Sequence, residues 1–171
     1  TIFKEIDKPA KDFLGKVCSL WERSIFQFKE IKIRTVALRT GIVLSKDGGA
    51  LKKMKTPVIT ALGNGKQYMP WIHIDDLCEL YIKAIEDQEF KGAFNAVSSE
   101  HISNLSFSKK ISKIFNYPFL ALGAPSLILQ IVFGEMSTII LNGSRISANK
   151  IKQAGFKFKF ENLEKALKNL R

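Results

Sequence analysis

The fold class of this chain is decided by the stretch Ile31-Lys32-Ile33-Arg34-Thr35-Val36-Ala37-Leu38-Arg39. Its β-branched residues and its late apolar run predict a strand that becomes buried in a sheet. The preceding residues predict a long amphipathic helix from Asp12 to about Phe28, because large apolar side chains recur there at helical spacing and Asp12 can cap the first turn. A helix followed by a buried strand is typical of an α/β fold.

The same alternation continues along the chain and predicts its remaining elements. Pro70–Ile74 is a short extended piece, and residues 94–97 form a second buried strand. We expect the later part of a doubly wound domain over residues 1–98 and a small, mostly helical lobe over residues 99–171. The other predicted elements are a helix over 50–62 broken near Pro57, a helix over 76–87 capped by Asp75, a helix capped by Asn104 that runs to Phe115, a strand over 119–122, a helix over 125–133, a short helix capped by Ser147 and ended by Gly155, and a helix over 161–170.

Composition narrows the class of protein. The chain has 171 residues, of which 46% are hydrophobic, so it can bury a core. Its longest apolar candidate, residues 120–133, is interrupted by Gly123, Pro125 and Gln130 and is too short to span a membrane. The first residues do not resemble a signal peptide, which favours a cytoplasmic protein. Cys18 and Cys78 have no metal-ligand spacing, so we expect buried thiols and no metal site.

The net charge of +11 comes from 27 Lys and Arg against 16 Asp and Glu. Such an excess can attract phosphate-bearing ligands or nucleic acid. Most of it, however, is lysine scattered along predicted amphipathic helices rather than gathered in one basic arm. Nucleic-acid binding is therefore the less favoured interpretation.

Four segments together resemble a known family. They are Leu38-Arg39-Thr40-Gly41-Ile42-Val43-Leu44, Asp47-Gly48-Gly49-Ala50-Leu51, Trp71-Ile72-His73-Ile74-Asp75-Asp76-Leu77 and Ala154-Gly155-Phe156-Lys157-Phe158. Their order and spacing are similar to those of atypical short-chain dehydrogenase/reductases described as epimerase-family or sugar-nucleotide-epimerase-like proteins, a group that includes proteins loosely called cell-division inhibitors. The resemblance spans nearly the whole chain and places it in the C-terminal half of such a protein.

The resemblance implies an NAD(P)-binding Rossmann-type fold and a split cofactor site. Members of the family carry a glycine-rich turn that holds the cofactor pyrophosphate, and this sequence contains no such turn. By resemblance, Arg39 at the end of its strand reaches the cofactor, and Thr40, Gly41 and Val43 line the nicotinamide side. The resemblance also favours NADP(H) over NAD(H).

Typical members use a Tyr-x-x-x-Lys pair on the helix before this strand, in which tyrosine transfers a proton and lysine lowers its pKa. If Glu22 aligns with the acidic residue of that helix, the pair falls near Leu14 and Cys18, and neither can perform this chemistry. No Tyr-x-x-x-Lys occurs elsewhere in the chain. This departure from the family pattern supports a second hypothesis, a cofactor-sensing or regulatory protein that has lost the reaction.

Several side chains have both a functional and a structural interpretation. Arg39 can grip a phosphate or a ribose oxygen, or form a structural salt bridge. Gln67, Tyr68 and Trp71 can form a substrate wall or pack in the core, and Arg145 can meet substrate or a neighbouring helix. His73 is the less usual choice for catalysis, since it lies between isoleucines in an apolar strand, while Asp75 and Asp76 suit a helix start.

The function that the sequence favours is an NAD(P)-dependent epimerase/dehydratase or reductase-like protein acting on a small or nucleotide-linked substrate. The catalytic residues, the substrate, the reaction direction and the oligomeric state are not set by the sequence. A basic module that binds nucleic acid or acidic partners is the third interpretation.

Overall fold

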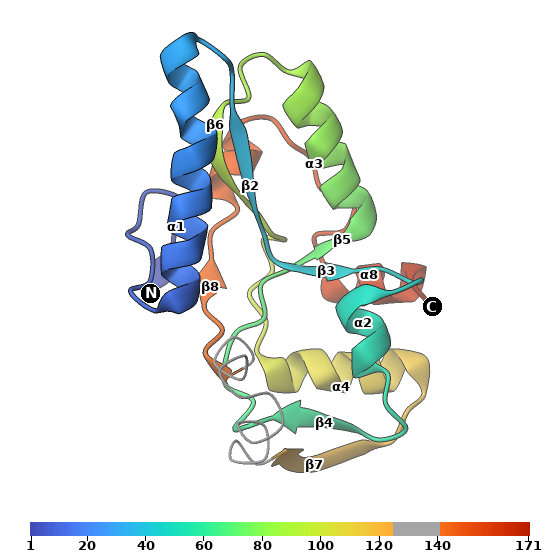
Figure 1. The fold of residues 1–171 in the computed structure, drawn as a ribbon. Coiled ribbons are helices and arrows are strands. Elements are labelled where there is room, and N and C mark those ends of the chain that lie inside the picture. The colour runs from blue at the N-terminus through green and yellow to red at the C-terminus, as the bar shows by residue number, and fades with distance from the viewer. Residues whose placement is uncertain (125–140) are drawn as a thin grey trace.

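The computed structural model describes residues 1–124 and 141–171. Within these ranges the strands form four parallel pairs (Figure 1). Strand β2 (Val36–Thr40) pairs with β6 (Gly92–Ala96), and β3 (Ile42–Leu44) pairs with β5 (Trp71–His73). The other pairs are β4 (Ile59–Leu62) with β7 (Phe119–Ala124), and β1 (Ile2–Phe3) with β8 (Arg145–Ile146).

Helices connect and flank these parallel strands, as the predicted α/β class requires. Helix α1 (Phe13–Phe26) and helix α3 (Ile74–Glu86) lie on either side of the β2–β6 pair, and α4 (Asn104–Phe115) packs beside β4 and β7 (Figure 1). The remaining helical elements are η1 (Gln27–Ile31), α2 (Gly49–Met54), α7 (Asn149–Gln153) and α8 (Leu163–Asn169).

Gly41 allows one stretch of chain to belong to two strand pairs. Its N–H donates to Ala96 O at 3.2 Å and closes the β2–β6 ladder, whereas the next N–H, of Ile42, donates to Pro70 O at 2.8 Å and opens the pairing with β5. A Cβ on Gly41 would lie 2.7 Å from Pro70 O and 2.9 Å from a Val97 methyl. Glycine is therefore required here by close approach.

Two hydrophobic clusters form the core. The first gathers buried residues from both sides of the predicted boundary at residue 98, among them Trp71, Phe107 and Leu167. The second packs beneath α3 and around β6, with Leu80, Phe90 and Phe94 at its centre. The two-part division into residues 1–98 and 99–171 stays a prediction, but the first cluster joins the two parts in one core.

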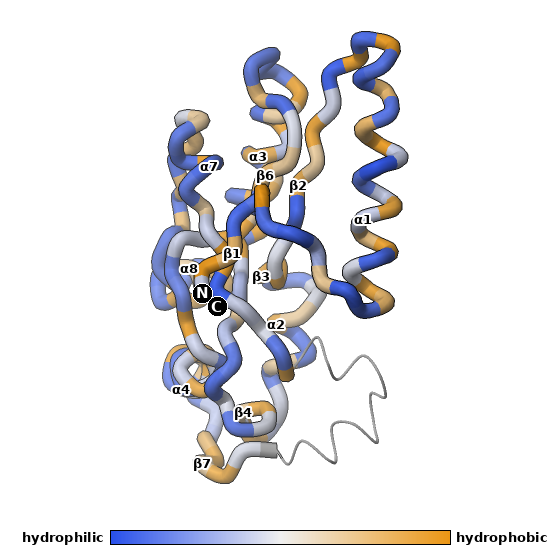
Figure 2. The backbone as a smooth tube through the Cα atoms, turned by 90° about the vertical axis from the view of Figure 1, so that its left-hand side faces the viewer, coloured by the Kyte–Doolittle hydropathy of each residue, from blue (hydrophilic) through white to orange (hydrophobic). Residues whose placement is uncertain are grey.

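Helix α1 differs from this pattern. None of its residues is buried, and hydrophilic and hydrophobic positions alternate along it (Figure 2). Its first turn is capped as predicted, because the side chain of Asp12 accepts the N–H of Gly15 at 2.8 Å.

The prediction of buried thiols is wrong: Cys18 on α1 and Cys78 on α3 are both free and exposed. The reason for Cys78 is its place on α3, outside the buried face of Asp76, Leu77 and Leu80.

The prediction of one interrupted helix over residues 50–62 is also wrong. Only Gly49–Met54 is helical, and Ile59–Leu62 forms strand β4, which pairs with β7. Pro57 cannot donate to a helical ladder, and the β-branched residues after it favour a strand once a partner strand is present. The partner lies about sixty residues later in the chain, which local pattern alone does not reveal.

Several helix starts move by one or two residues. Ser103, rather than Asn104, caps α4, and His73, rather than Asp75, caps α3. Ser147 does accept the N–H of Asn149 at 3.2 Å, although α7 itself begins after Ala148.

The predicted helix over residues 125–133 lies outside the described residues. None of the described helices is long and apolar enough to cross a membrane.

We expect Gly41→Ala to lower the free energy of unfolding by about 2–3 kcal/mol, the upper range for overpacking, because its Cβ would collide with the Pro70 carbonyl and Val97. Gly48→Ala is the matched control, since its Cβ would meet nothing within 4 Å. It should cost at most about 1 kcal/mol, the effect of losing a glycine N-cap. Urea denaturation of both variants measures the difference, and equal losses would contradict the close-approach argument.

Candidate functional site

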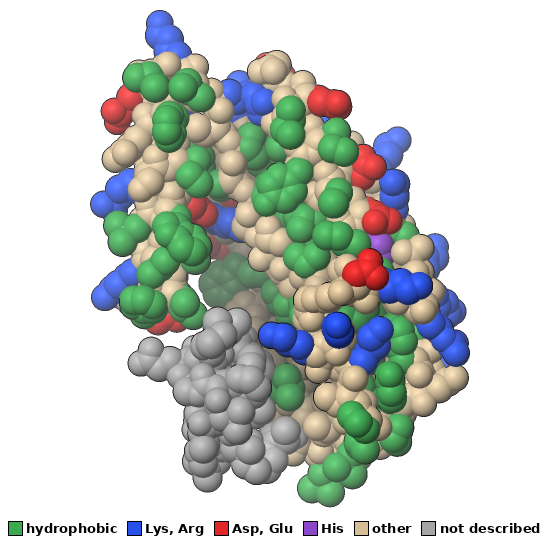
Figure 3. Space-filling view, turned by 45° about the vertical axis from the view of Figure 1, so that its right-hand side comes forward, with side chains coloured by type: hydrophobic (Ala, Val, Ile, Leu, Met, Phe, Trp, Pro, Cys, Tyr) green, Lys and Arg blue, Asp and Glu red, His purple; other side chains and the backbone are tan. Residues whose placement is uncertain are grey.

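A pocket of about 870 Å³ lies between α1, the open edge of β2 and the N-terminal segment. Every residue of β2 lines it, together with Gly41 and side chains from α1, α3 and residues 3–10. The pocket reaches the carboxyl ends of β2 and β6, since Thr40, Gly41 and Val97 line it, and ligands bind at such ends in open parallel sheets. Figure 3 shows hydrophobic side chains exposed over α1 and α3 on either side of the hollow. They include Trp21 (67% exposed) and Tyr81 (52%), which both line the pocket.

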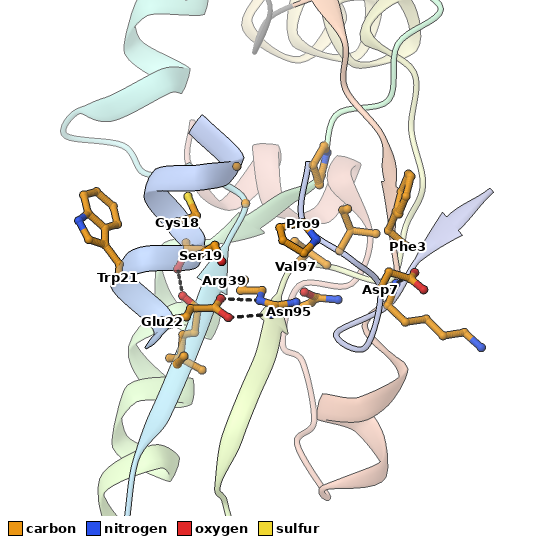
Figure 4. Close-up of a pocket in the computed structure, with 18 of the residues that line it drawn as sticks. Phe3, Asp7, Pro9, Cys18, Ser19, Trp21, Glu22, Arg39, Asn95 and Val97 are labelled. Carbon is orange, nitrogen blue, oxygen red and sulfur yellow. Dashed lines mark hydrogen bonds and ion pairs between the residues drawn. The ribbon is translucent and has the colours of Figure 1, made fainter. Parts of the chain in front are cut away.

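Arg39 is the central charged group of this pocket (Figure 4). Its Nε donates to Glu22 Oε1 at 2.6 Å and its Nη2 to Glu22 Oε2 at 2.8 Å, so the two side chains form a bidentate pair between β2 and α1. Its Nη1 donates to the backbone carbonyl of Glu5 at 2.9 Å. The guanidinium thus holds three parts of the chain together: the strand, the helix and the N-terminal segment.

The pairing sets what Arg39 can bind. The hydrogen bonds that Arg39 donates to Glu22, and the charges of the Glu22 and Glu5 carboxylates, raise the pKa of Arg39 against the opposing effect of burial, so the guanidinium stays charged. Its positive charge is balanced by Glu22, and three of its five N–H donors are engaged. The remaining two have no acceptor among the described residues. A charge-balanced fork of this kind suits a hydroxyl or carbonyl oxygen better than a free phosphate.

Asn95 lies opposite Arg39 in the β2–β6 register. Its backbone N–H donates to the Glu5 carboxylate at 3.0 Å, and its side-chain amide donates to Ser147 O at 3.2 Å. Sequence reasoning missed both Glu5 and Asn95 as members of this site. A polar Asn in a buried run, directly before the strand ends, was the available signal, but its partners depend on the strand register.

The residues predicted to bind cofactor are partly brought together. Arg39, Thr40 and Gly41 line the pocket, and the Thr40 hydroxyl donates to Leu38 O at 3.3 Å. Val43 does not line it, because β3 turns away after Gly41 and Val43 packs against the second hydrophobic cluster. The cofactor contacts of all four residues stay predictions.

Two of the predicted substrate residues are internal in this structure. Trp71 has no exposed surface and lies in the first hydrophobic cluster. Gln67 is buried, and its side-chain amide donates to Leu62 O at 2.9 Å, which holds the loop around Gly63 and Gly65. Their burial agrees with the packing alternative that the sequence left open. Their contact with a substrate stays a prediction.

The other two, Tyr68 and Arg145, meet each other. The Arg145 guanidinium lies 5.1 Å from the centre of the Tyr68 ring. The two residues line a small recess with His101, whose Nε2 lies 3.0 Å from Ile146 O. The chain is held closely here, because a Cβ on Gly143 would meet the Tyr68 carbonyl. Arg145 therefore contacts an aromatic ring on a loop rather than a neighbouring helix.

The positions aligned with the missing Tyr and Lys both lie on α1. Cys18 lines the pocket one helical turn before Glu22 (Figure 4), whereas Leu14 is not among the lining residues. Neither side chain can pass a proton as the Tyr–Lys pair does. Within the described residues, no group of three His, Cys, Asp or Glu gathers as a metal site.

The sequence was compared with protein-family models and with known proteins. Residues 124–170 match the family model described as a domain of unknown function, DUF1731. An epimerase family protein of Staphylococcus aureus is 36% identical over 163 residues, which is 93% of this chain and 54% of that protein. One from Staphylococcus epidermidis is 38% identical over the same shares. The chain is similar to these epimerase-family proteins over nearly its whole length. It spans about half the length of the curated relatives it matches.

Solved structures agree with this assignment. The human epimerase family protein SDR39U1, crystallised with NADPH, is 26% identical, covers 99% of this chain and 59% of its own, and superposes with a TM-score of 0.85. A dTDP-4-dehydrorhamnose reductase from Bacillus anthracis, in complex with NADP, has a TM-score of 0.75 at 20% identity and covers 99% of this chain and 58% of its own. The second likeness concerns the fold alone. The predicted resemblance and the Rossmann-type fold class are thereby confirmed.

We expect the Arg39–Glu22 pair to contribute about 1 kcal/mol of coupling energy to folding, since both side chains are partly exposed and solvent screens them. A double-mutant cycle with Arg39→Ala and Glu22→Ala, followed by urea denaturation, measures this coupling. The matched control is the exposed pair Lys91–Glu89, whose atoms lie 3.4 Å apart and whose coupling should be near zero. A coupling no larger than that of the control would contradict the structural role of the pair.

Proposed function

We propose that this chain contributes the Arg39 side of the cofactor site in an NAD(P)-dependent epimerase/dehydratase- or reductase-like protein. The observation that carries the proposal is the position of Arg39: its guanidinium lies in a pocket at the carboxyl ends of two parallel strands and keeps two N–H donors that have no acceptor among the described residues. The likeness to a human epimerase family protein crystallised with NADPH supports it.

A nicotinamide cofactor, when bound, supplies hydride transfer. The residues of this chain would bind and orient. Arg39, fixed by Glu22 and Glu5, would donate to a neutral oxygen such as a ribose hydroxyl or an amide carbonyl. Thr40 and Gly41 would allow the ligand to approach the backbone at the strand end.

NADP(H) is favoured over NAD(H) by the human relative and by the reductase crystallised with NADP. Another neighbour of the same fold, a UDP-glucose 4-epimerase from Thermus thermophilus, was crystallised with NAD, so the preference is modest. The substrate class that we propose is a small or nucleotide-linked molecule, and the Tyr68–Arg145 recess would offer it a polar wall.

The second candidate is a cofactor-sensing protein that no longer performs the reaction. Leu14 and Cys18 favour it, because they stand where the Tyr and Lys of typical members are expected. Cofactor binding without turnover of any nucleotide-sugar substrate would support this candidate, and turnover would support the first. Duplex DNA binding with a steep salt dependence would instead support the basic interaction module.

The proposal is tested by titrating NADPH and NADH into the complete protein while following nicotinamide fluorescence. We expect Arg39→Ala to raise the Kd for NADPH by about tenfold, which corresponds to about 1.4 kcal/mol and to the loss of hydrogen bonds from a charged donor. The ratio of the Kd values of Arg39→Ala and the wild type should change little between low and moderate salt, because Glu22 balances the charge of Arg39.

Arg34→Ala is the matched control. Arg34 also donates to backbone carbonyls, those of Ala84, Ile85 and Phe90, but it is not a lining residue of the pocket. Its loss should leave the Kd unchanged. An equal effect of both substitutions would assign the change to stability, and no binding of either cofactor by the folded wild-type protein would refute the proposed function.

A further inference from the structure

Two buried titratable side chains lie outside the pocket and have no part in the proposed function. His73, at the end of β5, is 1% exposed, and Asp76, in the first turn of α3, is fully buried. Both face residues 159 and 160, more than eighty positions later in the chain. The sequence predicted only a core histidine and a first-turn acid, so their contact with this distant segment needs an explanation.

Asp76 and His73 hold the segment in two ways. The Asp76 carboxylate accepts both the N–H of Lys159, at 2.7 Å, and the N–H of Phe160, at 3.0 Å. The His73 ring stacks on the Phe160 ring, with centroids 3.9 Å apart and planes inclined by 29°. One residue fixes the backbone of the segment and the other fixes its side chain.

The segment in turn joins the two hydrophobic clusters. Phe156 and Phe158 pack in the second cluster, and Phe160 packs against the first. Directly after it comes α8, which contributes Leu163 and Leu167 to the first cluster. Release of residues 159 and 160 would therefore loosen the attachment of α8 and the link between the clusters.

The contacts of His73 require a neutral ring. Its Nδ1 accepts the N–H of Asp75 at 3.1 Å, so the proton of the neutral ring sits on Nε2. That Nε2 is buried and has no partner at hydrogen-bonding distance among the residues that the structure describes, although Asn169 of α8 lies near enough to favour the protonated ring. A second proton would occupy Nδ1, abolish the cap and place a charge where water does not reach.

The groups around the ring do not remove this penalty. Asp75 Oδ2 lies 3.8 Å from Nδ1. Both carboxylate oxygens of Asp76 already accept backbone N–H groups, those of Lys159 and Phe160. From the elements packed against the ring, Lys159 pairs with Glu79 at 3.2 Å, and Asn169 of α8 is polar but uncharged. Burial lowers the pKa of His73 below its ordinary value, and the attraction of the two aspartates together with the interaction with Asn169 only partly opposes this shift.

We propose that His73, Asp76 and Phe160 form an acid-sensitive latch that holds residues 156–171 against the body of the protein near neutral pH and releases them on acidification. The direction follows from linkage: a histidine that is harder to protonate in the folded state favours folding in its neutral form. Its contribution is complete above the ordinary pKa of about 6.5 and is lost as the pH falls below it.

Hydrogen exchange of this chain at pH 7.5 and 5.5, corrected for the intrinsic pH dependence, tests the latch. We expect the protection of the Lys159 and Phe160 amides to fall at least tenfold at pH 5.5, while that of strand β6 is kept. In His73→Asn the side chain can still cap α3 but cannot titrate, so this pH effect should disappear. Unchanged protection in the wild type, loss of protection throughout the chain including β6, or the same pH effect in the variant would overturn the proposal.

A second measurement uses only the wild-type chain and so does not depend on the folding of a variant. In an NMR titration, the His73 ring should titrate below the ordinary histidine pKa of about 6.5, and the amide signals of residues 159 and 160 should change with it. Titration of His73 at or above that pKa, or without any change in those amides, would refute the latch.

Discussion

The contact between Gly41 and the Pro70 carbonyl constrains the rest of the structure. At this point the chain leaves one parallel ladder and enters another. The Pro70 carbonyl lies so close to Gly41 that a residue with a Cβ would collide with it. Residues before Gly41 are held by β6 and residues after it by β5. The bend therefore sets both where β2 ends, one residue after Arg39, and where β3 begins. The pocket and the first hydrophobic cluster are arranged around it.

A single side chain, Arg39, also connects several parts of the pocket. Arg39 bridges a strand, a helix and the N-terminal segment, so the same guanidinium that organises the wall of the pocket could also, as proposed, donate to a ligand. The sequence posed these roles as alternatives, a salt bridge or a ligand contact. The geometry of a planar, five-donor group allows both at once, because the bidentate pair with Glu22 occupies only one edge of the fork.

The parts of the fold that could be predicted are those whose residues show a local hydrophobic pattern. The helix after Asp12, the buried strands ending at Thr40 and Ala96, and the short extended piece at Trp71 all have apolar runs or helical spacing that local physics reads directly. Strand β4 could not be found in this way, since residues 59–62 become a strand only through pairing with β7. The pocket partners Glu5 and Asn95 depend likewise on strand register, and Asp76 depends on a loop eighty residues away. The missing Tyr-x-x-x-Lys, by contrast, was visible from sequence because it is an absence within one helix.

The pairing of β1 with β8 has a consequence for folding kinetics. It joins Ile2 to Arg145 and Phe3 to Ile146, and Ser147 donates to Phe3 O at 2.8 Å, so the contact closes a loop of most of the chain. Such a loop has a high entropic cost to close and gains only two residue pairs. We therefore expect the N-terminal segment to dock late, after the local helices and the longer ladders have formed. Since residues 3–10 build one wall of the pocket, the pocket takes its final shape in one of the last steps of folding.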